Sequence, residues 1–221
     1  SVSRGLGDVY KRQARMLMFK EAFMQHYYTN DPDLAHDERT FDFELGGHRL
    51  RFTTDNGVFS KHTVDFGSRV LIATVLAETL PDGPILDVGA GYGPIGLALA
   101  KHFPNRQVTM SDVNERALAL AKQNAADNGI TNVSIIESSM YDSIDDQFAV
   151  VVTNPPIRAG KAIVSGILSG AAAHLLPGGQ LYAVIQKKQG APSALKLMKA
   201  TYANAEVIKK EHGYYILKAS K

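Results

Sequence analysis

Short apolar runs alternate with amphipathic segments along most of the chain. From residue 84 onward, five apolar runs have the length of strands, and most are separated by segments of helical period such as 95–102 and 115–128. The runs are 84–88, 107–112, 133–137, 148–153 and 180–186. Alternation of this kind predicts a parallel sheet that is covered by helices on both faces.

The last two apolar runs of the chain follow a different pattern. Residues 205–212 and 214–220 are separated only by Gly213, so they can pair only as antiparallel neighbours. The sequence therefore predicts an α/β fold of the Rossmann-like type. Its sheet is mostly parallel and seven-stranded, and it closes with an antiparallel C-terminal strand.

A small β-hairpin is predicted ahead of this sheet. Residues 39–45 and 48–54 alternate apolar with polar side chains around Gly46 and Gly47, which is typical of a hairpin with a two-residue turn. Residues 65–80 then show helical spacing that stops before Pro81. The hairpin and this helix lead into the first core strand.

The N-terminal residues carry weaker signals. Residues 1–15 show neither alternation nor helical period, which indicates a disordered leader or a non-native tag, and residues 16–28 are amphipathic. We expect residues 16–83 to hold an N-terminal helix, the hairpin, and an active-site loop and helix. They form one domain with a cofactor-binding core over 84–221.

Composition narrows the class of protein. A chain of 221 residues can bury the core of one α/β domain, and the lack of cysteine excludes disulfides, thiolate catalysis and zinc sites that use sulfur. The seven histidines show no ligand spacing, so we expect no metal. Apolar runs end well before the roughly 18 residues of a membrane span, which favours a cytoplasmic protein without a membrane partner. With 24 basic and 22 acidic residues, any nucleic-acid surface must be a local patch.

A glycine-rich stretch, 87–96, lies where the first core strand ends and a helix begins. In open α/β sheets, ligands bind over this edge. Gly89, Gly91 and Gly93 would let the backbone turn tightly against a ligand. Gly91, Gly93 and Gly96 also satisfy the dinucleotide fingerprint, so the glycines alone do not separate adenosylmethionine from a nicotinamide cofactor.

Two acidic residues favour S-adenosyl-L-methionine. Asp87 ends the first strand, where its carboxylate could meet the ammonium of the methionine portion, and Asp112 ends the second strand, where it could bind both ribose hydroxyls. Alternatively, Asp87 caps the turn and Asp112 caps the next helix. Further candidate cofactor contacts are Val113, Ser139 and Met140.

The motif Asn154, Pro155, Pro156 and Ile157 follows the fourth core strand and so lies beside the expected cofactor. An exocyclic amine is a poor nucleophile because its lone pair is delocalised into the ring. The Asn154 side-chain carbonyl and the Pro155 backbone carbonyl could each accept one amine hydrogen and direct the lone pair at a methyl group. Rigid prolines preorganise these acceptors, so Asn154, Pro155 and Pro156 are the candidate catalytic residues, and Asn154 also borders the cofactor. The alternative is a proline-rich turn with asparagine as turn former.

Three segments together resemble a known family. GVFSKHTVDFGSRVLI at 57–72, DVGAGYGPIG at 87–96 and NPPIRAGK at 154–161 are similar to the methyltransferase small domain of the 16S ribosomal RNA guanine N2 methyltransferases. The likeness runs from about Tyr27 to the C-terminus. It implies a class I fold that binds adenosylmethionine through Asp87, Gly89, Gly91 and Asp112. It also implies that 154–156 hold the guanine amine, that the loop at 57–60 borders the active site, and that ribosomal RNA or the small ribosomal subunit is the partner.

The sequence departs from that family at the position of a base-stacking side chain. Many relatives place an aromatic residue where this chain has Ile157, so Phe59 could supply the stacking surface instead or belong to the core. Arg158 and Lys61 are candidates for substrate contact within a basic patch for RNA phosphates. The other members of that patch would be Arg49, Arg51, Arg69, Lys161, Lys187 and Lys188. Apart from Arg158 and Lys161, which adjoin the Asn-Pro-Pro motif, the alternative is that these cations are scattered and solvated.

Other functions compete with this hypothesis. The same chemistry could act on adenine N6 in DNA or on a glutamine amide in a protein, because Asn-Pro-Pro motifs serve those amines as well. A binding module that holds adenosylmethionine or RNA without turnover would not need the intact Asn-Pro-Pro motif. If the chain were a nicotinamide dehydrogenase, the motif at 154–157 would have no role.

Overall fold

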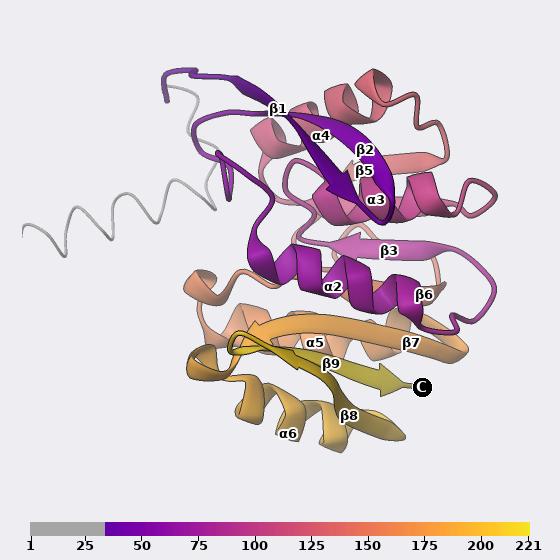
Figure 1. The fold of residues 1–221 in the computed structure, drawn as a ribbon. Helices are drawn as coiled ribbons and strands as arrows, with labels where there is room; N and C mark the ends of the chain where they lie inside the picture. The colour runs from indigo at the N-terminus through magenta and orange to yellow at the C-terminus, as the bar shows by residue number, and fades with distance from the viewer. Residues whose placement is uncertain (1–33) are drawn as a thin grey trace, which may run out of the picture.

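The computed structural model describes residues 34–221 (Figure 1). The predicted leader over 1–15 and the amphipathic segment over 16–28 lie outside the described residues. The strands are β1 (Arg39–Leu45), β2 (His48–Thr54), β3 (Ile85–Val88), β4 (Val108–Asp112), β5 (Val133–Glu137), β6 (Phe148–Thr153), β7 (Leu175–Gln186), β8 (Asn204–Glu211) and β9 (Tyr214–Ser220). The helices are α2 (Phe66–Ala77), α3 (Pro94–His102), α4 (Glu115–Asp127), α5 (Lys161–His174) and α6 (Ala191–Thr201), with 3₁₀ turns η1 (Ile157–Ala159) and η2 (Lys187–Gln189). Within 34–221, no helix combines the length and apolar character needed to span a membrane.

The main sheet has seven strands in the order β5-β4-β3-β6-β7-β9-β8. Strands β3 to β7 are parallel, and β9 is antiparallel to both of its neighbours, β7 and β8. The predicted antiparallel pairing of the last two strands is confirmed. Because β9 inserts between β7 and β8, β8 returns to the direction of the other strands and β9 alone is antiparallel.

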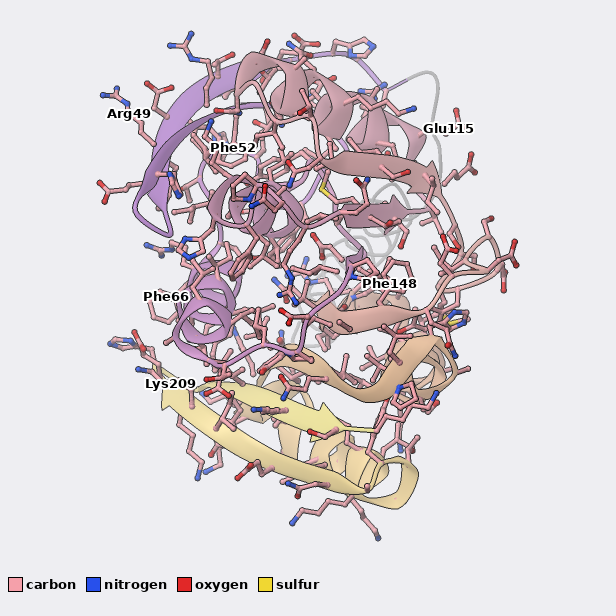
Figure 2. All side chains as sticks on the ribbon, turned by 90° about the vertical axis from the view of Figure 1, so that its right-hand side faces the viewer. Arg49, Phe52, Phe66, Glu115, Phe148 and Lys209 are labelled. Carbon is pink, nitrogen blue, oxygen red and sulfur yellow. The ribbon has the colours of Figure 1, made fainter. Side chains whose placement is uncertain are left out.

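Two hydrophobic cores lie on opposite faces of this sheet, because successive side chains of a strand point to opposite sides. On β3, Ile85 enters one core and Leu86 the other. The first core is completed by α2, α3, α4 and the hairpin, and the second by α5 and α6. Phe52 belongs to the first core and Phe148 to the second (Figure 2). The predicted three-layer α/β fold is confirmed.

The β1–β2 hairpin forms as predicted and lies over α3 and α4 (Figure 1). Its turn residues Gly46 and Gly47 have φ angles of 58° and 79°, which is the left-handed conformation that a two-residue turn of this kind requires. Leu50 and Phe52 are fully buried, whereas Arg51 between them is exposed. One face of the hairpin therefore closes the first core.

Helix α2 ends earlier than the apolar pattern predicted. The spacing indicated a helix to residue 80, but the helix stops at Ala77, and Glu78 has extended backbone angles (φ −88°, ψ 156°). Pro81 disfavours a helical conformation at Leu80, so the apolar side chain of Leu80 packs from the connection to β3 instead. At its other end, Asp65 is the N-cap and accepts a hydrogen bond from the Ser68 N–H.

A buried amide joins the hairpin to the main domain. The Asn124 side chain on α4 accepts from the Thr53 N–H at 2.7 Å and donates to the carbonyls of Thr53 at 3.1 Å and Tyr92 at 2.9 Å. These three bonds connect β2, α4 and the loop after β3. Asn128, one turn later, is half-buried and pairs in the same way with the N–H (2.8 Å) and carbonyl (2.7 Å) of Arg51, which is exposed.

We expect Asn124→Ala to lower the free energy of unfolding by roughly 2–4 kcal/mol, because it leaves three buried backbone groups without partners. The matched control Asn128→Ala should cost only about 1 kcal/mol, since water can replace its amide. Urea denaturation of the two variants measures the difference. Equal losses would contradict the role of Asn124 as a buried link.

Candidate active site

The carboxyl ends of the parallel strands meet at one edge of the sheet, and most of the predicted site residues lie at these strand ends or in the loops that follow them. The loop after β3 contains Gly89, Gly91 and Gly93, with φ angles of 74°, 57° and 97°. Gly89 and Ala90 donate their N–H groups to the Ser111 carbonyl on β4, at 2.9 and 3.0 Å. The glycine loop is therefore fastened to the neighbouring strand, and α3 begins directly after it at Pro94.

The open side of the glycine loop suits a ligand. A Cβ built on Gly91 has nothing within 4 Å, so glycine is required there by its left-handed backbone and not by crowding. A Cβ on Gly89 would lie 4.0 Å from Cδ of Pro156. The loop thus faces open space on one side and the Asn-Pro-Pro motif on the other.

Asp112 fastens this loop from the end of β4. Its Oδ2 accepts from the Gly91 N–H at 2.8 Å, and its Oδ1 accepts from the Asn114 N–H at 2.9 Å. Burial raises the pKa of Asp112, although these backbone bonds and one from Val113 oppose the rise. The cap of α4 is Asn114, which accepts from the Ala117 N–H. Asp112 is therefore not the helix cap, and this half-buried residue stays a candidate for ribose.

Asp87 lies beneath the loop with no exposed surface. Its Oδ2 accepts from the Gly96 N–H at 2.8 Å, whereas its Oδ1 is buried without a hydrogen-bond partner. Burial raises the pKa of Asp87 to about 7, the Gly96 bond opposes this, and the charge of Asp112 adds to it. An unsatisfied acceptor beside the loop fits a ligand that carries a cationic donor, but full burial means that the loop must shift for direct contact.

Ser139 and Met140 follow β5 on the same edge. Ser139 is exposed. Met140 has a left-handed backbone (φ 49°), and its side chain packs on α5, where a Cβ on Gly166 would lie 2.6 Å from the Met140 sulfur. The side chain of Met140 therefore packs against the second core.

The Asn-Pro-Pro motif leaves β6 beside the end of β3. Thr153 Oγ1 donates to the Val88 carbonyl at 2.8 Å, which joins the two strand ends. The half-buried Asn154 donates from Nδ2 to both carboxylate oxygens of Asp65, each at 3.2 Å, and to Ser68 Oγ at 3.1 Å. Pro155 is buried, and η1 follows with Ile157 packed on the second core and Arg158 exposed.

The loop at 57–60 borders the same edge. Asn114 Nδ2 donates to the Gly57 carbonyl at 2.9 Å, which places the loop over the start of α4. Phe59 is 56% exposed, so it does not belong to the core. Lys61 is committed to other groups: its Nζ lies 2.6 Å from Asp37 Oδ2 and 2.7 Å from Asn56 Oδ1, with the side chain only 12% exposed. This ion pair weakens the case for Lys61 as a substrate contact.

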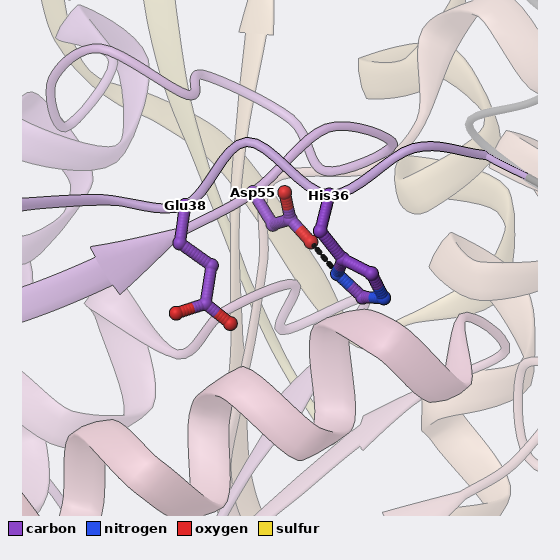
Figure 3. A group of neighbouring side chains, drawn as sticks. All are labelled: His36, Glu38 and Asp55. Atoms are coloured by element: carbon purple, nitrogen blue, oxygen red, sulfur yellow. Dashed lines mark hydrogen bonds and ion pairs between the residues drawn. The ribbon is translucent and has the colours of Figure 1, made fainter.

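One group of side chains has the composition of a metal site. His36, Glu38 and Asp55 place possible ligand atoms within 4.8 Å of one another, and His36 turns toward Asp55 (Figure 3). Asp55 already accepts from His36 Nδ1 at 2.5 Å and from the N–H groups of Asp37 and Asn56 at 2.6 and 2.7 Å, and Arg116 lies 3.3 Å away. Because these donors occupy the buried carboxylate, Asp55 anchors the segment before the hairpin to α4.

Sequence reasoning missed Asp65 and Ser68, which hold Asn154. Asp65 immediately precedes a helical pattern, so a helix cap could have been predicted there. Its contact with Asn154, 89 residues further along the chain, leaves no local signal.

The model of the methyltransferase small domain matches residues 49–218. The chain belongs to the methyltransferase small domain family. The resemblance expected from the three motifs is thereby confirmed.

Two curated relatives illustrate the range of the family. The Bacillus subtilis (strain 168) protein YbxB, whose name states no activity, is 49% identical over 199 residues, covering 89% of this chain and 98% of that protein. Ribosomal RNA small subunit methyltransferase C of Serratia proteamaculans (strain 568) is 32% identical over 177 residues, covering 78% of this chain and 49% of that protein.

A solved structure shares the fold. The 16S rRNA N2 methyltransferase RsmC of T. thermophilus, determined with AdoMet and guanosine, has a TM-score of 0.76 and 25% identity. The match covers 86% of this chain and 52% of that chain. The family and this AdoMet-bound neighbour support the predicted cofactor. The chain spans about half the length of these methyltransferase C relatives.

We expect Asp87→Asn to stabilise the protein without ligand at about pH 8, and to have little effect at about pH 4. The unfolded carboxyl loses its proton near 3.8 and the folded one near 7, so this carboxyl costs stability progressively as the pH rises between these values. The gain at high pH should be about 4 kcal/mol, since each pKa unit corresponds to about 1.4 kcal/mol. Urea denaturation between about pH 4 and pH 8 measures this gain in stability, with the exposed substitution Asp82→Asn as control. A gain that does not depend on pH would contradict the raised pKa of Asp87.

Proposed function

We propose that this chain is an S-adenosyl-L-methionine-dependent methyltransferase that modifies the exocyclic N2 amine of a guanine in 16S ribosomal RNA. The observation that carries the proposal is the position of Asn154–Pro156 against the glycine loop, with Cδ of Pro156 4.0 Å from a Cβ on Gly89. An amine held by the first motif would lie next to a methyl donor held by the second. Two findings support a guanine of ribosomal RNA as the acceptor. Relatives of this chain are named ribosomal RNA small subunit methyltransferase C, and the RsmC structure contains guanosine together with AdoMet.

The residues proposed to hold the donor surround the glycine loop. Gly89, Gly91 and Gly93 give backbone access. The half-buried Asp112 offers ribose the lone pairs that its bonds from the Gly91 and Asn114 N–H groups leave unused, and Asp87 supplies a buried carboxylate oxygen without a hydrogen-bond partner. Val113, Ser139 and Met140 line the same edge. Bound adenosylmethionine supplies a sulfonium methyl group, whose transfer to nitrogen leaves a neutral thioether and releases one proton.

Positioning by Asn154 and Pro155 supplies the catalysis. Their carbonyl oxygens accept the two amine hydrogens, which draws the nitrogen lone pair out of conjugation and aims it toward the loop. Pro155 and Pro156 lack N–H groups and have restricted φ angles, so both acceptors stay fixed during the reaction. No strong base is required, because water can take the proton from the methylated nitrogen.

Recognition of RNA is proposed for the loops at the rim of the site. Phe59, which is 56% exposed on the loop at 57–60, offers a ring on which the target base can stack, and Ile157 offers apolar contact. Arg158, Lys161, Lys187 and Lys188 are exposed on η1, α5 and η2 at this edge of the sheet, where they can bind phosphates. A substrate in the small ribosomal subunit would place the enzyme in the cytoplasm.

We expect labelled methyl groups from adenosylmethionine to enter unmodified 16S RNA or small ribosomal subunits, and nuclease digestion to release N2-methylguanosine. Parallel reactions contain duplex DNA and a peptide release factor, which test adenine N6 and glutamine amide acceptors. Label that appears only in DNA or only in protein would overturn the RNA assignment. Comparing naked RNA with the assembled subunit identifies the form of the substrate.

Asn154→Ala should lower kcat by about 100-fold or more, as does the loss of one preorganised hydrogen-bonding group at other catalytic sites. Binding of adenosylmethionine, measured by calorimetry, should remain because the glycine loop is untouched. Full turnover by this variant would contradict the role of Asn154.

A further inference from the structure

The orientation of the Asn154 side chain depends on a residue that the Asn-Pro-Pro motif does not contain. The Asp65 carboxylate lies 3.2 Å from Asn154 Nδ2 through each of its oxygens, and Ser68 Oγ lies 3.1 Å from the same nitrogen. An asparagine amide has one end that donates and one end that accepts. Which end faces the active site therefore decides whether the residue can accept a hydrogen from an amine.

The chemistry of Asp65 settles that orientation. An ionised carboxylate only accepts hydrogen bonds, so the amide end that faces it must be the NH₂ group. The reversed amide would set its oxygen against the negative carboxylate. With Nδ2 held by Asp65 and Ser68, Oδ1 is directed away from α2 and is left to accept from a substrate.

The position of Asp65 is itself fixed by helix α2. As N-cap of that helix, Asp65 accepts from the Ser68 N–H at 3.0 Å, and Ser68 is only 3% exposed. The neighbouring Gly67 is tightly enclosed, since a Cβ there would lie 2.9 Å from the Tyr214 ring and 3.1 Å from Asp65 Oδ2. The start of α2 is therefore a rigid support for the carboxylate.

We propose that Asp65, together with Ser68, is a positioning residue that locks the Asn154 amide with its oxygen toward the acceptor nitrogen. This inference rests on the proposed function and deepens it. This fixed orientation selects acceptors that present N–H hydrogens. It also means that the Asn154 side chain loses no conformational entropy when the substrate binds and does not adopt the reversed amide orientation. Asp65 does not touch the substrate and acts only through Asn154.

The first test removes the charge of Asp65 and keeps its shape. Asp65→Asn keeps an N-cap, since asparagine caps helices as well as aspartate does, but it offers one acceptor oxygen to two donors and can itself turn the Asn154 amide round. We expect kcat to fall by about 10- to 100-fold. The KM for RNA and the affinity for adenosylmethionine should stay at wild-type values. Asp82→Asn, an exposed substitution of the same kind in the turn before β3, should match the wild type.

The double variant gives the decisive comparison. Asn154→Asp alone sets two carboxylates against each other and should be the least active. Asp65→Asn combined with Asn154→Asp restores a donor and acceptor pair in the reverse direction and leaves a carboxylate oxygen facing the site. We expect the double variant to be more active than Asn154→Asp. An Asp65→Asn enzyme with wild-type kcat, or a double variant without rescue, would overturn the proposal.

A spectroscopic measurement on the wild type tests the orientation of Asn154 even if the variants above fold poorly. It does not depend on activity, so it also separates this proposal from the proposed function. In the ¹⁵N-labelled wild type, the Asn154 side-chain NH₂ protons should exchange slowly with water, and Asp65→Ser, which keeps a cap but removes the carboxylate, should speed that exchange. Exchange as fast in the wild type as at an exposed asparagine such as Asn105 would refute the lock. If the wild type methylates none of the acceptors, the proposed function fails, and this exchange rate still decides the orientation.

Discussion

The pairing of β3 with β6 is the constraint on which the candidate site depends. The two strands run parallel in a register that sets Val88 against Thr153, and the Thr153 hydroxyl bonds the Val88 carbonyl at 2.8 Å. The chain segments that leave these two positions are the glycine loop and the Asn-Pro-Pro motif. Because parallel strands end at the same edge, both segments emerge side by side although about 60 residues separate them. A shift of register would separate the two motifs.

The remaining elements hold this edge in place. Asp112 and Ser111 fasten the glycine loop to β4, and Asn114 fastens the loop at 57–60 to the start of α4. The N-terminus of α2 meets the Asn-Pro-Pro motif through Asp65. Each contact is a polar bond between a loop and the end of a regular element. The loops can therefore carry polar chemistry without a hydrophobic core of their own.

Buried carboxylates show that the site is not arranged for stability alone. Asp87 is fully buried with one unsatisfied oxygen, which raises its pKa to about 7, and burial also raises the pKa of Asp112. An apolar side chain at either position would avoid this desolvation cost. Strained backbones at Ser60 and Met140, with φ angles of 56° and 49°, lie at the same edge. Such local costs are typical of functional sites, where the surrounding fold compensates them.

The sequence by itself determined the elements, because period, turn glycines and caps are local properties. The strands and the hairpin turn at Gly46 and Gly47 followed from such signals, and the motifs at Gly89 and Asn154 indicated the family. Tertiary structure alone decided the strand order, with β9 between β7 and β8. It also decided the ion pair between Lys61 and Asp37, the burial of Asp87 and the hydrogen bonds between Asn154 and Asp65. These features depend on contacts between residues far apart in the chain, and no local pattern encodes such a contact.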